Sequence, residues 1–293
     1  MITKDEFQKE QRKLKTISKE VKLVRDNLAK EVVGDLEDFR EFQKLAWQDK
    51  SSFDRAEFNQ VLSNNEMEAR RILAKRMYFK RICLIASKPY FASFKYQDED
   101  GKNYNIYMSL TYLKDDNYNN ILYDWRSPIC SVFYDYETGP CKYLAPEGII
   151  SGILYSKRQY QIKDNKLLAV FDNSLNIDDE VLQEVLANNS SDKMKNVVNT
   201  IQKEQNLVIR NLEDKNLIVQ GIAGSGKTSV ALHRIAFLLY RIDNLSSKDI
   251  LIFSPNEVFS SYISNVLPEL GEENTKETTF SDYLSYLSLI HIW

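Results

Sequence analysis

The first part of the chain repeats its apolar positions with the period of an amphipathic helix. Thr3 and Glu6 have the spacing of a capping box, which starts a helix. Behind them, apolar residues recur at the intervals of a coiled-coil seam: Phe7, Leu14, Ile17, Val21, Val24 and Leu28. The only early glycine, Gly34, stands where this helix could end.

A second run with helical period extends from about Asp54 to Ala86. Its seam is interrupted by Arg76 and otherwise consists of Ile72, Phe79, Cys83 and Ala86. No proline precedes Pro89. Two such runs with an irregular middle predict an antiparallel helical hairpin, a coiled coil, over residues 1–88.

After Pro89 the period changes to two. Alternation is visible in YNIYMSL (104–110), SVFYDY (131–136) and KRQYQIKD (157–164), with glycine and proline between the runs. Residues 89–175 therefore predict a small, mostly antiparallel β region. Within it, YDWRSP (123–128) is interpreted as a structural corner, in which Arg126 pairs with Asp124 beside a half-buried Trp125. The alternative is contact of the region's aromatic and basic side chains with nucleic acid.

From Asp178 onward the period is helical again, and IDDEVLQEVLANN and SDKMKNVVNTIQKEQNLVIRN predict two consecutive helices. Leu217 to Gln220 then predicts a short buried strand, Ser229 to Tyr240 a helix, and Asp249 to Asn256 a second buried strand. This order predicts a parallel sheet with a right-handed crossover. The fold class expected for the whole chain is α+β with several domains, and residues 176–293 form the start of an α/β lobe.

Composition restricts the classes of function. The chain has 293 residues, 43% hydrophobic and 28% charged, which is typical of a soluble protein with about two domains. Its longest apolar runs are too short for a transmembrane helix, and its N-terminus has no signal-peptide pattern. Three cysteines without metal-type spacing fit a reducing cytosol, so we expect a cytoplasmic protein. We also expect a monomer. With two histidines, a His-based metal site is not expected.

Charge is segregated along the hairpin. Residues 1–30 and 69–90 are rich in Lys and Arg, whereas residues 31–68 are rich in Asp and Glu. A hairpin would place both basic ends at its base and Asp35, Glu37 and Asp38 near its tip. Such a tip could enter a narrow positive or metal-containing channel. The alternative is a solvated coiled coil that acts only as a spacer or dimerises.

The strongest chemical signal is Gly221-Ile222-Ala223-Gly224-Ser225-Gly226-Lys227-Thr228, which fits G-x-x-x-x-G-K-[ST] between a predicted strand and a helix. Backbone N–H groups of such a loop hold phosphates. The predicted nucleotide-binding residues of the loop are Gly221, Ala223, Gly224, Ser225, Gly226, Lys227, Thr228 and Ser229. Lys227 would reach the β- and γ-phosphates as the catalytic residue, and Thr228 would bind Mg²⁺.

Upstream of this loop, Gln205 is a candidate for recognition of the base. A glutamine amide carries a donor and an acceptor, which match N6 and N7 of adenine. The predicted cofactors are therefore ATP and Mg²⁺. The loop alone does not separate kinases, GTPases and helicases.

In several stretches the chain resembles superfamily 1 helicases of the UvrD/Rep type and, more specifically, HelD-type RNA polymerase recycling ATPases. The matching stretches are YDWRSP (123–128), KRQYQI (157–162), SDKMKNVVNTIQKEQN (191–206), AGSGKTSVALHRIAFLLY (223–240) and SPNEVFSSYISNVLPELGEEN (254–274). The resemblance implies a RecA-like ATPase lobe. It also implies an N-terminal arm that enters the secondary channel of bacterial RNA polymerase, and nucleotide turnover linked to release and recycling of the polymerase.

The end of the chain departs from that pattern. ATP hydrolysis in such proteins needs a Walker B Asp-Glu pair and an arginine from a second lobe, and no apolar strand ending in Asp-Glu follows Asn256. We therefore expect a fragment from a truncated reading frame, which binds nucleotide weakly and hydrolyses it poorly by itself. The alternatives are a DNA repair helicase of the UvrD type, which would make DNA a partner, and a non-catalytic module that binds the polymerase channel.

Overall fold

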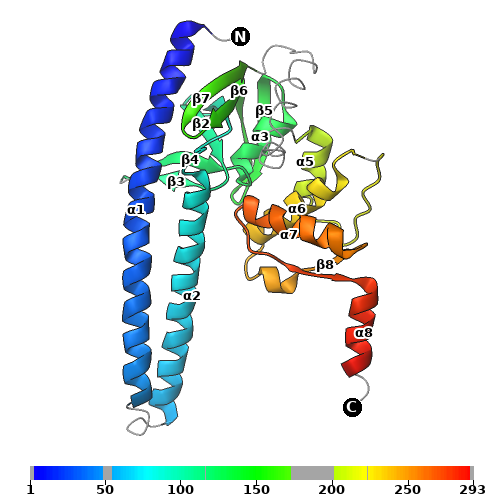
Figure 1. Cartoon of the computed structure of the whole chain (residues 1–293). Helices are drawn as coiled ribbons and strands as arrows, with labels where there is room; N and C mark the ends of the chain where they lie inside the picture. Colours follow the sequence, from blue (N-terminus) through cyan, green and yellow to red (C-terminus); the bar gives the residue numbers. More distant parts are fainter. Residues whose placement is uncertain (1–2, 49–54, 116, 173–200, 223, 291–293) are drawn as a thin grey trace.

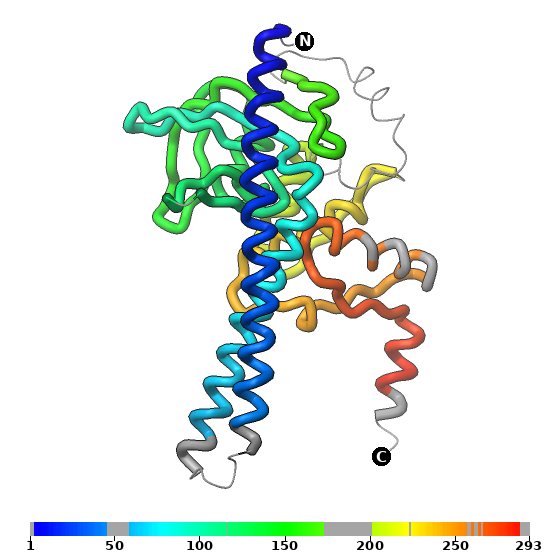
Figure 2. The backbone as a smooth tube through the Cα atoms, turned by 60° about the vertical axis from the view of Figure 1, so that its left-hand side comes forward, coloured from blue at the N-terminus to red at the C-terminus, as the bar shows by residue number. Residues whose placement is uncertain are grey.

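A computed structural model describes residues 3–48, 55–115, 117–172, 201–222 and 224–290. The N-terminal arm is a hairpin of two helices, α1 (Lys4–Gln48) and α2 (Arg55–Ile85). The N-terminal half of α1 lies along the sheet, and the far half of α1 runs beside α2 beyond the sheet (Figures 1 and 2). The capping box is present, because Thr3 N donates to Glu6 Oε2 (3.1 Å) and Glu6 N donates to Thr3 Oγ1 (3.3 Å). The predicted hairpin is thus confirmed.

The first helix is longer than predicted. It passes through Gly34 and continues to Gln48, about 20 Å beyond Asp35 along the axis. Asp35 accepts ion pairs from Lys75 (2.7 Å) and Arg71 (3.6 Å) of α2. The prediction that Asp35, Glu37 and Asp38 lie near the tip was therefore wrong. A single glycine costs only about 1 kcal/mol in a helix, and packing against α2 outweighs it.

The seam of α2 agrees with its prediction at Ile72 and differs near the C-terminal end of the helix. Ile72, Ile82 and Ile85 are buried, whereas Cys83 is exposed. Arg76, which interrupted the predicted seam, is also exposed. The base of α2 packs against a sheet as well as against α1, and this second contact selects the face that is buried.

The β region is one seven-stranded sheet. Its strands are β1 (Ala92–Asp98), β2 (Asn103–Ser109), β3 (Leu113–Lys114), β4 (Asn120–Asp124), β5 (Gly139–Ala145), β6 (Gly148–Lys163) and β7 (Lys166–Asp172). The order is β3-β4-β2-β1-β6-β5, and β7 pairs with the far end of β6. All pairs are antiparallel except β2 with β4, so the predicted antiparallel region is confirmed.

One predicted strand in this region is a helix. After the short η1 (Pro128–Cys130), the chain forms α3 (Ser131–Asp135), where the SVFYDY alternation had predicted a strand. Val132, Phe133 and Tyr134 are all buried, although a half-exposed strand would bury only every second one. Contacts on several sides of this turn, including Phe133 against Phe94, override the alternation.

The sheet separates two apolar cores. Ile106 and Met108 of β2 face a core shared with the helices that follow the sheet, whereas Tyr107 between them packs against the core of the arm. The arm core contains residues from α1, α2 and the sheet: Leu14, Ile17, Val21, Ile82, Ile85, Tyr90, Leu113, Leu122, Tyr160, Ile162, Leu167 and Val170. Much of the predicted heptad seam of α1 therefore packs on the sheet.

The C-terminal part of the described chain is a set of helices around a two-stranded parallel sheet. Its elements are α5 (Lys203–Arg210), α6 (Lys227–Arg241), η3 (Ser247–Asp249), β8 (Leu251–Ser254), α7 (Glu257–Glu269), β9 (Lys276–Thr279) and α8 (Phe280–Ile290). β8 pairs in parallel with β9, and α7 connects them. The two helices predicted after Asp178 lie outside the described residues as far as residue 200.

The predicted buried strand at Leu217–Gln220 is wrong. This segment has no strand conformation, and the side chain of Ile218 is 93% exposed. Within the described residues no strand pairs with it, and an unpaired extended segment cannot satisfy its backbone hydrogen bonds as a ladder. The structure therefore shows a mixed α+β protein, in which β8 and β9 are the parallel pair of the C-terminal part. The RecA-like lobe stays a prediction.

Candidate nucleotide site

The glycine loop enters α6 with the backbone conformation that its sequence predicts. Gly224 and Gly226 have φ of +81° and +79°, in the left-handed region that glycine adopts without strain. Gly226 is the N-cap of α6, and Lys227 and Thr228 are its first residues. The loop therefore ends at a helix N-terminus, where free backbone N–H groups favour an anion. Ala223 lies outside the described residues.

The side chain of Lys227 is folded over the loop. Its Nζ donates to the carbonyl oxygens of Gly221 (2.9 Å) and Ile222 (2.6 Å). Ser225 packs on the same turn, and a Cβ on Gly221 would lie 2.6 Å from Ser225 Oγ. The loop thus places the ammonium group next to the backbone that would surround a phosphate.

Gln205 lies beside the glycine loop. It sits in the first turn of α5, where its Oε1 accepts from Gln202 N (3.1 Å). Its Nε2 lies 3.6 Å from the position that a Cβ on Gly226 would occupy. The structure therefore brings Gln205 together with the loop, which begins sixteen residues later in the sequence, as the predicted site requires. Recognition of adenine by Gln205 stays a prediction.

The remaining predicted residues occupy the first turn of α6. Thr228 is half-buried there. Among the described residues, no cluster of three His, Cys, Asp or Glu side chains could hold a metal. A single hydroxyl fits Mg²⁺ that arrives with the phosphates, because Mg²⁺ keeps several waters and takes few protein ligands. Thr228 would then supply the protein oxygen.

A buried polar layer lies between α6 and the corner at 123–128. Ser229 O accepts from His233 Nδ1 (2.7 Å), and the ring of His233 meets Trp125 edge-on at 5.6 Å. Burial lowers the pKa of His233 to about 4, so the imidazole is neutral at pH 7. Ser229 Oγ, His233 Nε2 and Trp125 Nε1 are buried without a hydrogen-bond partner within the described part of the chain.

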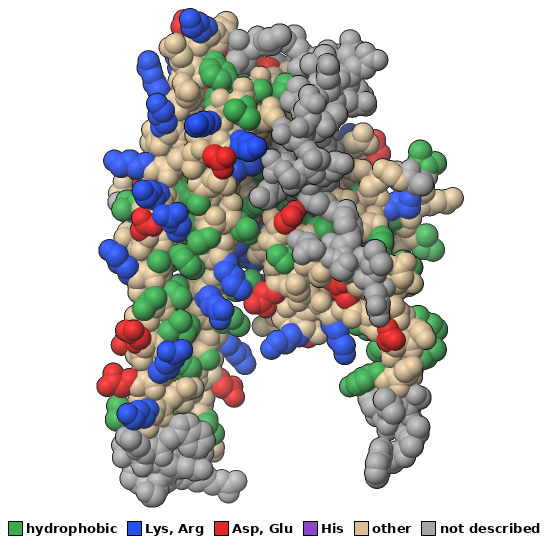
Figure 3. Space-filling view, in the orientation of Figure 1, with side chains coloured by type: hydrophobic (Ala, Val, Ile, Leu, Met, Phe, Trp, Pro, Cys, Tyr) green, Lys and Arg blue, Asp and Glu red, His purple; other side chains and the backbone are tan. Residues whose placement is uncertain are grey.

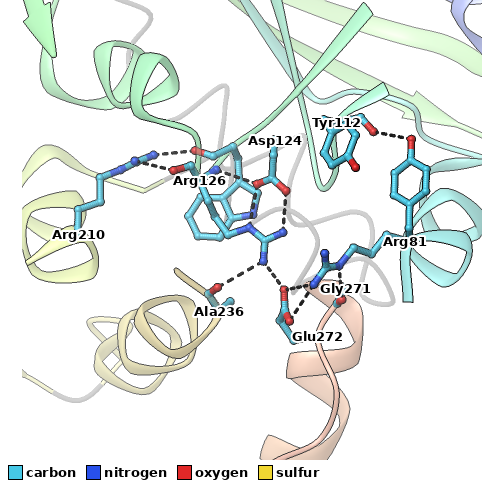
Figure 4. A network of polar contacts seen from close by, with 10 residues as sticks. Arg81, Tyr112, Asp124, Arg126, Arg210, Ala236, Gly271 and Glu272 are labelled. Carbon is cyan, nitrogen blue, oxygen red and sulfur yellow. Dashed lines mark hydrogen bonds and ion pairs between the residues drawn. The ribbon is translucent and has the colours of Figure 1, made fainter. Parts of the chain in front are cut away.

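Two arginines that the sequence analysis did not single out hold α5 and α6 in place. Arg210 donates to the carbonyl oxygens of Trp125 (2.7 Å) and Arg126 (3.0 Å) (Figure 4). Arg234 of α6 donates to the carbonyl oxygen of Val208 (2.7 Å) in α5. Surface helices often carry arginine, so no signal in the sequence marked these two half-buried arginines as contacts between elements.

The interpretation of YDWRSP as a structural corner is confirmed. Arg126 donates to Asp124 through Nε (2.8 Å) and Nη2 (2.6 Å), and also to Glu272. Trp125 is fully buried rather than half-buried. Burial alone would lower the pKa of Arg126, but Asp124 and Glu272 raise it above its ordinary value. Glu272, which also pairs with Arg126, was not predicted as part of this corner, because it follows α7 and lies far from residues 123–128 in the sequence.

These features define a protein with a helical arm, a central sheet and a glycine loop at a helix N-terminus. Residues 7–190, more than half of the chain, match the family described as "DNA helicase IV HelD, N-terminal domain". The chain therefore belongs to the HelD family. The matched range covers the arm and the sheet and ends before the glycine loop. No curated protein matches the chain. No helix in the described ranges is long and apolar enough to cross a membrane.

Proposed function

We propose that this chain binds ATP with Mg²⁺ at the loop from Gly221 to Ser229. The observation that carries the proposal is the meeting of three parts at one place. The left-handed glycines open onto the N-terminus of α6, Lys227 lies over the loop, and Gln205 Nε2 lies beside Gly226. Lys227 would bind the β- and γ-phosphates, Thr228 would hold Mg²⁺, and Gln205 would face the adenine.

The test is the affinity for a fluorescent ATP analogue with Mg²⁺, measured by anisotropy. Lys227→Ala should lower the affinity about 10- to 100-fold, because a charge-assisted hydrogen bond contributes about 1.5–3 kcal/mol. Lys248→Ala is the matched control, since Lys248 is exposed and lies outside the loop. Equal affinities of wild type and Lys227→Ala would contradict the proposal and favour a vestigial loop.

We also propose that the protein associates with bacterial RNA polymerase through its arm and couples ATP turnover to polymerase release and recycling. Membership of the HelD family and the projecting hairpin support this.

The polymerase proposal is tested by capture of purified bacterial core RNA polymerase. Glu37 and Asp38 are exposed on the far half of the arm, where Figure 3 shows basic and acidic side chains side by side. Reversal of both charges should weaken capture severalfold, and more at low salt. Reversal of Glu99 and Asp100, which are exposed in the turn between β1 and β2, is the control. Binding of DNA without binding of polymerase would instead favour a DNA-directed helicase.

A further inference from the structure

Four charged side chains form a continuous chain between the base of the arm and the corner of the sheet. Arg81 of α2 donates through Nη2 to Glu272 Oε1 (2.9 Å) and Oε2 (3.1 Å). Glu272 also accepts from Arg126, which is paired with Asp124 at its other end (Figure 4). Two cations and two anions thus alternate across three segments that are distant in the sequence.

This row of four charged side chains is deeply buried at its centre. The side chain of Arg126 is fully buried, those of Asp124 and Glu272 nearly so, and that of Arg81 is 23% exposed. Removing one partner of a buried ion pair leaves the other charge uncompensated in a medium of low dielectric. A shift of one member therefore forces a rearrangement of the others.

Helix α6, which follows the nucleotide loop, contacts the same row of charged side chains. Arg126 Nη1 donates to the carbonyl oxygen of Ala236 (3.3 Å), and its guanidinium lies 4.7 Å from the centre of the Tyr240 ring. Ala236 and Tyr240 belong to α6, whose first residue is Lys227. A change at the loop that moves α6 would therefore act on Arg126 directly.

At the arm end of the charged row, Arg81 packs closely against the turn after α7, and a cavity lies beside this contact. Arg81 Nε donates to Gly271 O (2.9 Å), and Gly271 has φ +85°. A Cβ on Gly271 would lie 3.2 Å from Arg81 Cγ. Next to this contact, a cavity of about 650 Å³ lies between α2 on one side and the end of α7 with the turn after it on the other; its lining includes Met77, Lys80, Cys83, Pro268 and Asn274. This space leaves room for the turn to move relative to α2.

We infer that the chain Arg81–Glu272–Arg126–Asp124 couples nucleotide binding at α6 to the position of the arm. The inference rests on the proposed nucleotide site. Lys227 now donates to the carbonyl oxygens of Gly221 and Ile222, and phosphate would compete for this ammonium group. Release of these bonds changes the loop at the start of α6. Arg126 then transmits the shift of α6 through Glu272 to Arg81.

The first experiment measures the affinity of the full chain for the fluorescent ATP analogue with Mg²⁺. Because coupling between two sites is reciprocal, weakening the arm end must change nucleotide affinity. Arg81→Met, which keeps the aliphatic stem, should change the dissociation constant at least about threefold. Arg76→Met is the matched control, because Arg76 is exposed on the same helix, and it should leave the affinity unchanged. Thermal melting confirms that both variants are folded.

The second experiment measures the arm directly. Spin labels are placed at Ser63→Cys on α2 and Lys248→Cys in η3, with Cys83→Ser to remove the exposed native thiol. We expect the distance between the labels to change when a non-hydrolysable ATP analogue binds, and this change to be lost in Arg81→Met and in Lys227→Ala.

The outcomes separate the two proposals. If Lys227→Ala abolishes nucleotide binding, but Arg81→Met binds like wild type and the label distance is insensitive to nucleotide, the site stands and the coupling is overturned. If wild type binds no nucleotide, the proposed function fails and the coupling fails with it. A label distance that changes equally in wild type and Arg81→Met would also overturn the role of this charge chain.

Discussion

Two stretches of this protein have the residue pattern of a β-strand, but only one of them forms a strand. The residues of β6 pair with β1, β5 and β7, and Leu154 and Tyr160 of this strand are almost completely buried. Leu217 to Gln220 is equally apolar at its start, yet it has no strand partner among the described residues, and Ile218 is 93% exposed. Apolar and β-branched residues thus make a segment able to form a strand, and the presence of a neighbouring strand decides whether the strand forms.

The largest expected effect breaks this comparison at single side chains. Phe94 is 1% exposed in the core between the sheet and the helices, so Phe94→Ala should lower the free energy of unfolding by about 3–5 kcal/mol. Ile218→Ala should change it by less than about 0.5 kcal/mol, because Ile218 gains little from folding. Urea unfolding followed by circular dichroism measures both. A large loss in Ile218→Ala would show that the 217–220 segment is packed in solution.

A second expected effect concerns pH on the α6 side of the sheet. The pKa of buried His233 is lowered to about 4, so between about pH 6.5 and 4 the unfolded state binds more protons than the folded state. Stability should therefore fall as the pH falls through this window, by about 2–3 kcal/mol between pH 7 and 4.5.

His233→Gln should flatten this decline, since glutamine does not titrate. The measurement is urea unfolding of wild type and variant at both pH values, and the difference between the two proteins isolates His233 from other groups. Parallel losses of stability would mean that His233 is not buried in the neutral form.

The smallest expected effect lies in the arm. Asp35→Asn removes its ion pairs with Lys75 and Arg71 and should lower the free energy of unfolding by about 0.5 kcal/mol at pH 7. Lys75 lowers the pKa of Asp35, so this contribution is present above the unfolded pKa and is lost as the pH falls through the folded one. Its window therefore lies below that of His233. Asp38→Asn, at an exposed position of the same helix, is the control and should have no measurable effect.

Much of the fold follows from local pattern. The capping box at Thr3, the helical periods of the arm and the period of two in β2 and β6 all predicted the observed elements. The two glycines at 224 and 226 predicted the turn into α6. These signals succeed because capping, periodicity and left-handed glycines are properties of a few neighbouring residues.

The failures share a cause that lies outside the local sequence. Gly34 did not end α1, because α2 packs alongside it. Ser131 to Asp135 formed a helix although its pattern alternates, and Ile82 rather than Cys83 faced the core. In each case a segment distant along the chain supplied the contact that chose between two local possibilities.

The sequence by itself determined the helical arm, the antiparallel sheet and a loop whose glycines and lysine suit phosphate. Only the tertiary structure placed Gln205 beside Gly226 and joined Arg81, Glu272, Arg126 and Asp124 into one buried chain. The reason is physical. Backbone conformation is set by neighbours in sequence, whereas burial of a charge requires partners that reach it from other elements, and no periodicity specifies which ones.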